Sequence, residues 1–271
     1  MMTSKEWQLA TDAAVRYQEI LVPAILGAFA EALVDYANLD HVDVLVDMGC
    51  GTGAATRYAA QKMSPSTTVI GIDRNAGMLK VAQSLPEIDG ATIEWKQDNA
   101  YDLSLEDNSV DAVICAQTLQ FMDKRHQALS EMHRILKAGQ SVYISLWSPI
   151  EESPYFDALV NTVATHINPD TAAGLGSAFN LSDIDEIKSL LQDAQFTEIS
   201  SDIAELHLEL PPIHEFVPRH ISATPMGAGY QAASESAQQA ILADMQSALS
   251  AYQTESGIRV PFCSHLIKGI A

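Results

Sequence analysis

The sequence predicts an α/β protein with a doubly wound, mostly parallel sheet of seven strands, an N-terminal helical cap and a helical lid insertion. Short runs of β-branched and apolar residues alternate with helical patterns through the middle of the chain, and a glycine-rich turn follows the first run. Alternating strands and helices form parallel βαβ units, whose strands are covered by helices on both faces.

The first forty residues are predicted to be helical. Apolar residues recur at spacings of three and four, which places them on one stripe: Trp7, Ala10, Ala14, Tyr17 and Leu21. Pro23 is expected to interrupt this helix, because proline has no N–H for the helical ladder. A second helical pattern then follows over 25–34.

Seven runs have the composition of strands. Five lie in the first half, at 44–46, 69–72, 93–95, 110–115 and 142–147. Helices are expected between several of them, at 54–62, 75–84 and 123–136. In the second half, leucines alternate with polar residues over 206–210, which indicates a half-exposed strand, and 258–270 is the last strand.

The second half is otherwise helical and irregular. Prolines and glycines break 148–179 into short helices and loops. Ser182 is expected to begin a capping box for a helix that ends near Leu191, and 231–252 forms a further helix.

The composition is that of a folded, acidic protein. The 271 residues are 47% hydrophobic and 18% charged, which argues against intrinsic disorder, and 15 Lys and Arg against 35 Asp and Glu give a net charge of −20. Such a surface repels phosphate backbones and anionic headgroups, so nucleic acid and membranes are not expected partners. It favours a cationic small molecule, although a halophilic or solubility-driven surface would have the same charge.

Cysteine content and the absence of a targeting pattern predict a cytoplasmic protein. Cys50, Cys115 and Cys263 lie far apart, match no metal-ligand spacing and are odd in number, which suits a reducing compartment. Residues 1–7 have no basic run before an apolar stretch, so no signal peptide is expected. No apolar run reaches the roughly 18 residues of a membrane-spanning helix. We therefore expect no metal and no membrane insertion.

The most informative segment is the turn after the first strand, residues 47–53 (DMGCGTG). Gly49, Gly51 and Gly53 let the backbone turn sharply and let a ligand approach the main chain. The helix that follows presents unpaired amides at its N-terminus. Taken alone, this pattern suits a dinucleotide, a nucleoside or no ligand.

Acidic residues near the strand ends narrow the choice of ligand. Asp73 lies about 20 residues after the glycines, where a carboxylate accepts hydrogen bonds from a ribose. Asp47 precedes the glycines, where it would repel a pyrophosphate but suits an amino group. Asp98, followed by Asn99 and Ala100, is placed to receive an adenine amino group and ring edge. These acids favour S-adenosylmethionine, which is cationic and has no phosphate.

Four segments have the pattern of known sequence motifs: DMGCGTG at 47–53, GID at 71–73, CAQTLQF at 115–121 and RILKAG at 134–139. Through them the chain resembles class I S-adenosylmethionine-dependent methyltransferases, of the small-molecule branch typified by the ubiquinone/menaquinone-biosynthesis C-methyltransferases. Ala138 and Gln140 depart from the proline and glycine usual in that family, in a turn remote from the cofactor. The resemblance implies a Rossmann-like fold with S-adenosyl-L-methionine as cofactor and S-adenosyl-L-homocysteine as product.

The resemblance also implies a single domain over 1–271. Its parts would be a cap (1–40), a cofactor-binding half (41–147), a lid that holds the substrate (148–230) and a C-terminal helix and strand (231–271).

The cofactor-binding residues are likewise implied by the resemblance. They are Tyr17, Asp47, Gly49, Cys50, Gly51, Gly53, Asp73, Arg74, Met78, Asp98, Asn99, Ala100 and Gln117. Tyr17 would cover the cofactor from the N-terminal helix, and Arg74 and Met78 would flank the adenine. Gln117 would approach the methionine part. The side chain of Cys50 is expected to be packed inside the turn rather than reactive.

Methyl transfer from a sulfonium is an in-line displacement, so the protein must align the acceptor, the methyl carbon and the sulfur in a dry site. A general base is needed only when the acceptor keeps its proton at the working pH. Among the residues expected in the lid, His220 is the first candidate for this base and His166 the second, followed by His214 and by the weaker Tyr155 and Tyr230. Each of the histidines also suits an ordinary surface or capping position.

Gln120, Trp147 and Tyr155 are expected to line the acceptor pocket, although Trp147 is equally expected as a core aromatic. The predicted acceptor is a small, partly apolar molecule of quinone-like, phenolic, indolic or terpenoid type.

Two alternative functions remain at this point. A protein that binds the same cofactor without turnover would carry the same motifs. A nicotinamide-dependent oxidoreductase would share the spacing of Gly49, Gly51 and Ala54, but Asp47 argues against it.

Overall fold

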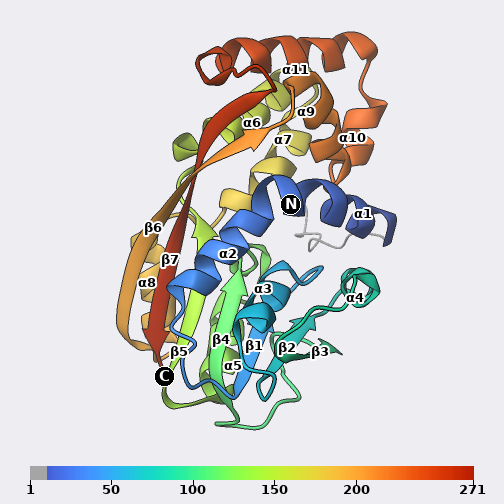
Figure 1. The fold of residues 1–271 in the computed structure, drawn as a ribbon. Helices are drawn as coiled ribbons and strands as arrows, with labels where there is room; N and C mark the ends of the chain where they lie inside the picture. Colours follow the sequence, from blue (N-terminus) through green and yellow to red (C-terminus); the bar gives the residue numbers. More distant parts are fainter. Residues whose placement is uncertain (1–10) are drawn as a thin grey trace.

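The computed structural model describes residues 11–271, so Trp7 and Ala10 of the predicted first helix lie outside the described residues. Figure 1 shows a central sheet with a group of helices beyond one end of it. The seven strands have the order β3-β2-β1-β4-β5-β7-β6. They are β1 (Val44–Met48), β2 (Thr68–Asp73), β3 (Thr92–Gln97), β4 (Val110–Ala116), β5 (Leu136–Trp147), β6 (Thr197–Leu210) and β7 (Ile258–Ile270).

The first five strands pair in parallel, and β7 and β6 complete the sheet in antiparallel pairs. The chain order reverses between β1 and β4, which is where ligands of open α/β sheets bind. The predicted α/β fold with seven mostly parallel strands is therefore confirmed.

Helices cover both faces of the parallel strands, as Figure 1 shows. The elements involved are α2 (Gly27–Tyr36), α3 (Ala54–Lys62), α4 (Ala76–Ser84), α5 (Arg125–Ile135) and α8 (Ile184–Asp193). Successive residues of β1 belong to different clusters: Leu45 packs with Leu33 of α2 and Ala59 of α3, and Val46 packs with Leu129 of α5. This alternation is expected of a strand buried on both faces.

The N-terminal segment is one continuous helical stretch, so the predicted break at Pro23 is wrong. It consists of α1 (Thr11–Arg16), a π-helix η1 (Tyr17–Leu26) and α2. Pro23 lies inside the π-helix, where the Gly27 amide donates to the carbonyl of Val22. Because the π-helix hydrogen-bonds over five residues, its wider turn lets the chain pass the proline without ending.

This stretch also contradicts the expectation that no apolar segment reaches the length of a membrane-spanning helix. The segment Ala13–Tyr36 is a 24-residue helix with mean hydropathy 1.4, which is long and apolar enough to cross a membrane by length and composition alone. The sequence does not reveal this length, because Pro23 predicts a break in the middle of the segment. Phe29 and Leu33 are fully buried in the folded chain, and core helices pass the same test.

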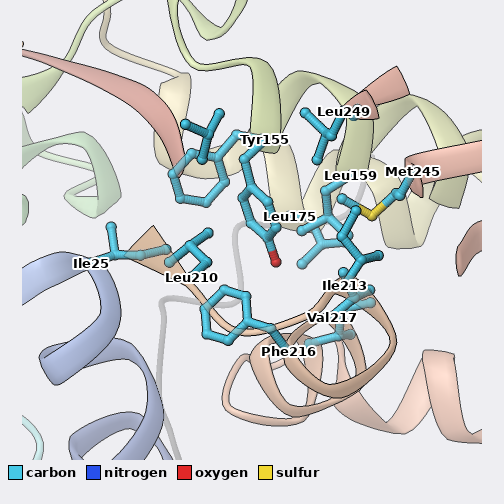
Figure 2. Packing of buried hydrophobic residues seen from close by; sticks show 14 of the residues in the cluster. Ile25, Tyr155, Leu159, Leu175, Leu210, Ile213, Phe216, Val217, Met245 and Leu249 are labelled. Atoms are coloured by element: carbon cyan, nitrogen blue, oxygen red, sulfur yellow. The ribbon is translucent and has the colours of Figure 1, made fainter. Parts of the chain in front are cut away.

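A second helical group surrounds the far ends of β6 and β7 (Figure 1). It comprises α6 (Pro154–His166), α7 (Pro169–Gly176), α9 (Ile213–Ser222), α10 (Gly227–Ala232) and α11 (Glu235–Ala248). Short 3-10 turns lie at Leu119–Phe121, Ile150–Glu152, Ser177–Phe179 and Ser250–Tyr252. Figure 2 shows Tyr155 inside its core, among Leu159, Leu175 and Ile213.

Several predicted boundaries differ from the structure. The carboxylate that caps α8 belongs to Asp183, which accepts from the amides of Asp185 and Glu186, so Ser182 is not the cap. The range 231–252, predicted as one helix, contains the end of α10, all of α11 and a 3-10 turn. Leu136 already pairs with Val110, so β5 begins six residues before the predicted strand.

Asp47 joins β1 to α3 in the interior. Its side chain is buried, and the Thr56 hydroxyl donates to its Oδ2 at 2.6 Å. Its Oδ1 has no hydrogen-bond partner among residues 11–271. Burial raises the pKa of Asp47 from 3.8 to about 7, against the lowering effect of the bond from Thr56.

The Asp47→Asn variant is expected to have a stability that depends less on pH. The folded pKa lies above the unfolded one, so the folded wild type holds an extra proton between about pH 4 and pH 7, and this stabilisation is lost as the pH rises through that window. Between about pH 5 and about pH 7.5 the loss is on the order of 2 kcal/mol. Urea unfolding at both pH values measures it. The exposed carboxyl of Asp40 supplies the control Asp40→Asn, which should keep the wild-type dependence.

Candidate functional site

One cavity lies at the carboxyl ends of the parallel strands, beside the N-terminal helix. Its wall includes Tyr17 of η1, Gly51 after β1, Asp73 at the end of β2, Trp147 at the end of β5 and His220 of α9. Segments from both halves of the chain therefore meet in a single hollow, at the edge where the topology places ligands.

The turn after β1 is held by the end of β2. The amides of Gly49 and Cys50 donate to the carbonyl of Ile72 at 2.8 and 2.9 Å, and the amide of Gly51 donates to Asp73 Oδ2 at 2.9 Å. A turn that cradles a pyrophosphate offers its amides to the phosphate oxygens. Here three of these amides already have partners within the protein, which favours a ligand without phosphate.

The three glycines serve different purposes, although all have positive φ. A Cβ on Gly49 would lie 2.2 Å from Thr118 Cγ2, and one on Gly53 would lie 2.2 Å from the Trp95 ring. A Cβ on Gly51 would meet nothing within 4 Å. Gly49 and Gly53 therefore make room for neighbouring side chains, whereas Gly51 leaves its free space to the cavity.

Asp73 lines the cavity and organises the backbone around it. Its Oδ1 accepts from the Asn75 amide at 2.7 Å, and its Oδ2 accepts from Gly51. Burial raises the pKa of Asp73, while these amide bonds act in the opposite direction. Each carboxylate oxygen keeps a further lone pair for a hydroxyl donor in the cavity.

The cavity also includes the segment after β3, with Asp98, Asn99 and Ala100. Asp98 Oδ2 accepts from the hydroxyl and the amide of Ser104 at 2.6 and 3.0 Å. Burial raises the pKa of Asp98, but the bonds from Ser104 and from the Asn99 amide outweigh it, so the pKa is lowered. Asp98 thus remains an anion, after a strand that β2 separates from β1 in the sheet.

Two glutamines follow β4 in the cavity wall. Gln117 has a φ of 49°, a strained left-handed conformation, and its Nε2 donates to the Ser264 hydroxyl at 2.8 Å. The Nε2 of Gln120 donates to Gln117 Oε1 at 3.3 Å. The pair thus turns from β4 toward the ends of the neighbouring strands.

The other half of the cavity is apolar. Trp147 lines it and packs against the rings of Phe29, Phe156 and Phe179, with centroids 4.8, 5.4 and 6.1 Å away. Trp147 is therefore both a core aromatic and a wall residue. His220 lies in the same wall, and its ring packs against those of Tyr155, Phe156 and Phe216.

Most of the residues implied for the site share this cavity. Those in the wall are Tyr17, Gly49, Gly51, Asp73, Arg74, Met78, Asp98, Asn99, Ala100, Gln117, Gln120, Trp147 and His220. Five do not line it: Asp47, Cys50, Gly53, Tyr155 and His166. The further base candidates, exposed His214 and buried Tyr230, do not line it either. For the first five, the structure shows where each residue lies instead.

These five occupy other places for physical reasons. Asp47 and Cys50 are buried behind the turn, and Gly53 packs against Trp95. His166 Nε2 pairs with Asp244 Oδ2 at 2.7 Å, so His166 joins α6 to α11. Tyr155 reaches the site only through its hydrogen bond to His220.

Most of the apolar wall is formed by residues that the sequence does not mark as part of a site. They include Leu21, Ile25, Leu26, Met48, Ile72, Phe121, Met122, Phe156, Leu159, Leu175 and Ala178. Apolar residues at helical spacing are typical of any core face, so no sequence signal separates a cavity wall from a packed core.

Comparisons with known proteins match part of the chain to methyltransferases. Residues 46–144 match a family described as methyltransferase domain. A demethylmenaquinone methyltransferase from Staphylococcus carnosus is 29% identical over 179 residues, which cover 60% of this chain and 73% of that protein. The ubiquinone/menaquinone biosynthesis C-methyltransferase UbiE from Hahella chejuensis is 39% identical over 97 residues, 35% of this chain and 39% of that protein.

An arsenite methyltransferase from Halobacterium salinarum is 25% identical over 165 residues, 60% of this chain and 40% of that protein. The matched segment thus spans less than half of the Halobacterium and Hahella proteins.

Solved structures agree on the fold. The YcgJ protein from Bacillus subtilis matches with a TM-score of 0.55 at 17% identity, over 90% of this chain and 97% of that one. Phosphoethanolamine N-methyltransferase 2 from Haemonchus contortus matches with a TM-score of 0.56 at 16% identity, over 96% of this chain and 57% of that one. Residues 46–144 of the chain thus match a methyltransferase domain, and the chain shares its fold with a solved methyltransferase.

Proposed function

We propose that the protein transfers the methyl group of S-adenosylmethionine to a small, partly apolar acceptor with a quinone-like or phenolic ring. One observation carries this proposal: a single cavity joins an acid-lined half beside Gly51 to an aromatic half beside Trp147. The first half suits a cationic nucleoside without phosphate, and the second suits a flat apolar molecule.

The residues of the polar half fit this cofactor. Asp73 would accept from the ribose hydroxyls and Asp98 would face the adenine amino group, while Gly51 leaves room for the cofactor at the main chain. Tyr17 would cover the cofactor from η1. Burial and the neighbouring carboxylates raise the pKa of Tyr17, so its phenol stays neutral.

The acceptor class follows from the aromatic half and from the relatives. Trp147, Phe156 and Leu159 form a wall for a flat ring, and two relatives act on menaquinone or ubiquinone precursors by name. An arsenite acceptor is disfavoured, because arsenite is a soft, thiol-seeking species and the three cysteines are buried outside the cavity wall.

The chain contributes mainly alignment and exclusion of water. When bound, S-adenosylmethionine supplies an activated methyl group on a sulfonium. The aromatic wall would orient the acceptor ring toward that end of the cofactor, and η1 would exclude water from both halves. These effects need no fixed catalytic triad.

Binding of S-adenosylhomocysteine, measured by calorimetry, tests the cofactor half. Absence of binding at millimolar concentration would end the proposal. Transfer of a labelled methyl group to naphthalenediol, phenol and indole probes in a single turnover tests catalysis. Binding without transfer to any acceptor of these classes would favour a protein that holds the cofactor without turnover.

Asp73→Ala is expected to weaken S-adenosylhomocysteine binding by about 1–3 kcal/mol, because the ribose hydroxyls lose their acceptor. Calorimetry on the variant measures this. Asp89→Ala removes the same charge from an exposed position before β3 and should bind like the wild type. Equal affinities of wild type and Asp73→Ala would refute the role of Asp73.

The variant Gly51→Ala tests whether the free space beside the turn is needed for cofactor binding. The added methyl group enters the cavity and should lower the affinity for S-adenosylhomocysteine at least about tenfold, at a strain cost of about 1 kcal/mol. Gly139 has a similar φ of 79° and equally open surroundings, but lies at the start of β5. Gly139→Ala should therefore lose similar stability in urea and keep full affinity; matching affinities in both variants would contradict the assignment.

A further inference from the structure

We propose that His220 acts on the acceptor as a fixed hydrogen-bond donor, its Nε2 carrying the proton because Tyr155 occupies Nδ1. The acceptor then presents a hydrogen-bond-accepting oxygen, such as a ring carbonyl or a phenolate, to the aromatic half of the cavity. This deepens the proposed function and rests on it for the acceptor, but not for the state of the histidine. It replaces the general-base role that the sequence suggests for His220.

The pair is buried and closely held. The hydroxyl of Tyr155 on α6 lies 2.9 Å from Nδ1 of His220 on α9. Tyr155 is fully buried and His220 is 4% exposed. Their rings are nearly parallel, with an interplanar angle of 14°. Figure 2 shows the Tyr155 hydroxyl pointing into the apolar cluster toward α9.

The surroundings decide which partner donates. The rings of Phe156, Phe216 and Phe262 pack around Tyr155, with centroids 5.7, 5.6 and 6.0 Å away, and none offers an acceptor of comparable strength. Nδ1 of His220 is the hydrogen-bond partner of the hydroxyl in the described chain. Were Nδ1 the donor, the tyrosine proton would be buried without a partner, which costs about 1–3 kcal/mol. The tyrosine therefore donates and Nδ1 accepts.

Neutrality then fixes the other nitrogen. Burial lowers the pKa of His220 to about 4 and raises that of Tyr155, so both are neutral near pH 7. A neutral imidazole carries one N–H, and with Nδ1 accepting, this proton is on Nε2. Nε2 has no hydrogen-bond partner among the described residues, and His220 lines the cavity. His220 thus presents an N–H donor to the cavity and no basic lone pair.

The tautomer can be read directly by ¹⁵N NMR of the imidazole in the ligand-free protein, since protonated and unprotonated ring nitrogens differ widely in chemical shift. We expect a protonated Nε2 and an unprotonated Nδ1 in the wild type. Tyr155→Phe removes the bond that selects this tautomer and should shift both nitrogens toward averaged values. A protonated Nδ1 in the wild type would overturn the proposal.

Two further variants separate a donor from a base. His220→Gln keeps an N–H donor and has no basic nitrogen, whereas His220→Leu keeps only the bulk. With 1-tetralone, a ring ketone, as the probe, we expect binding to weaken about tenfold in His220→Leu and to stay within about threefold in His220→Gln. Tetralin, the matching hydrocarbon, should bind all three proteins alike.

The results of these binding measurements can support or refute the donor role of His220. Equal losses for ketone and hydrocarbon, a loss in His220→Gln as large as in His220→Leu, or a wild type without preference for the ketone would each refute the donor role. Neither the tautomer nor the probe measurement requires the cofactor. A failure of S-adenosylhomocysteine to bind would instead refute the proposed function, so the two failures are distinguishable.

Discussion

The site depends on the clamp between the turn after β1 and the end of β2. Three consecutive amides, from Gly49 to Gly51, donate to the carbonyl of Ile72 and the carboxylate of Asp73. This clamp sets the path of the turn and points the bare Cα of Gly51 at the cavity. It also engages amides that a phosphate would otherwise need. The arrangement of the turn therefore favours a ligand without phosphate.

The second requirement is an apolar compartment next to this clamp, and it comes from the part of the chain with the fewest motifs. The helices around β6 and β7 bring Phe156, Leu159 and His220 to the ends of the parallel strands. Polar groups are sparse there, so each one has a large influence on what binds. A single N–H in such a wall discriminates among ligands more sharply than one of many polar groups in an open cleft.

The sequence was sufficient where local chemistry is dictated by backbone geometry. Gly51, Asp73 and Asp98 were found because positive φ, strand ends and carboxylates leave a pattern along the chain, and the order of strands and helices predicted the fold class. The π-helix around Pro23 was not found, because proline in a sequence signals a missing N–H and not the wider turn that accommodates it.

Contacts between distant segments were equally hidden. His166 and Tyr155 are unremarkable along the chain, and only packing decides that His166 pairs with Asp244 while Tyr155 reaches the cavity through His220. Asp47 keeps the position that the motif gives it, but it turns inward to Thr56 rather than lining the cavity.

The long pair of strands β6 and β7 contributes to different hydrophobic clusters near its two ends. Near one end Ile267 of β7 packs under the parallel sheet with α8, and near the other Val260 and Leu210 pack among the distal helices. A hydrogen-bonded ribbon runs without interruption between them, from Ser200 to Leu210 in β6. Unfolding at either end would remove packing partners from strands that the other end also needs, so the stabilities of the two ends are coupled.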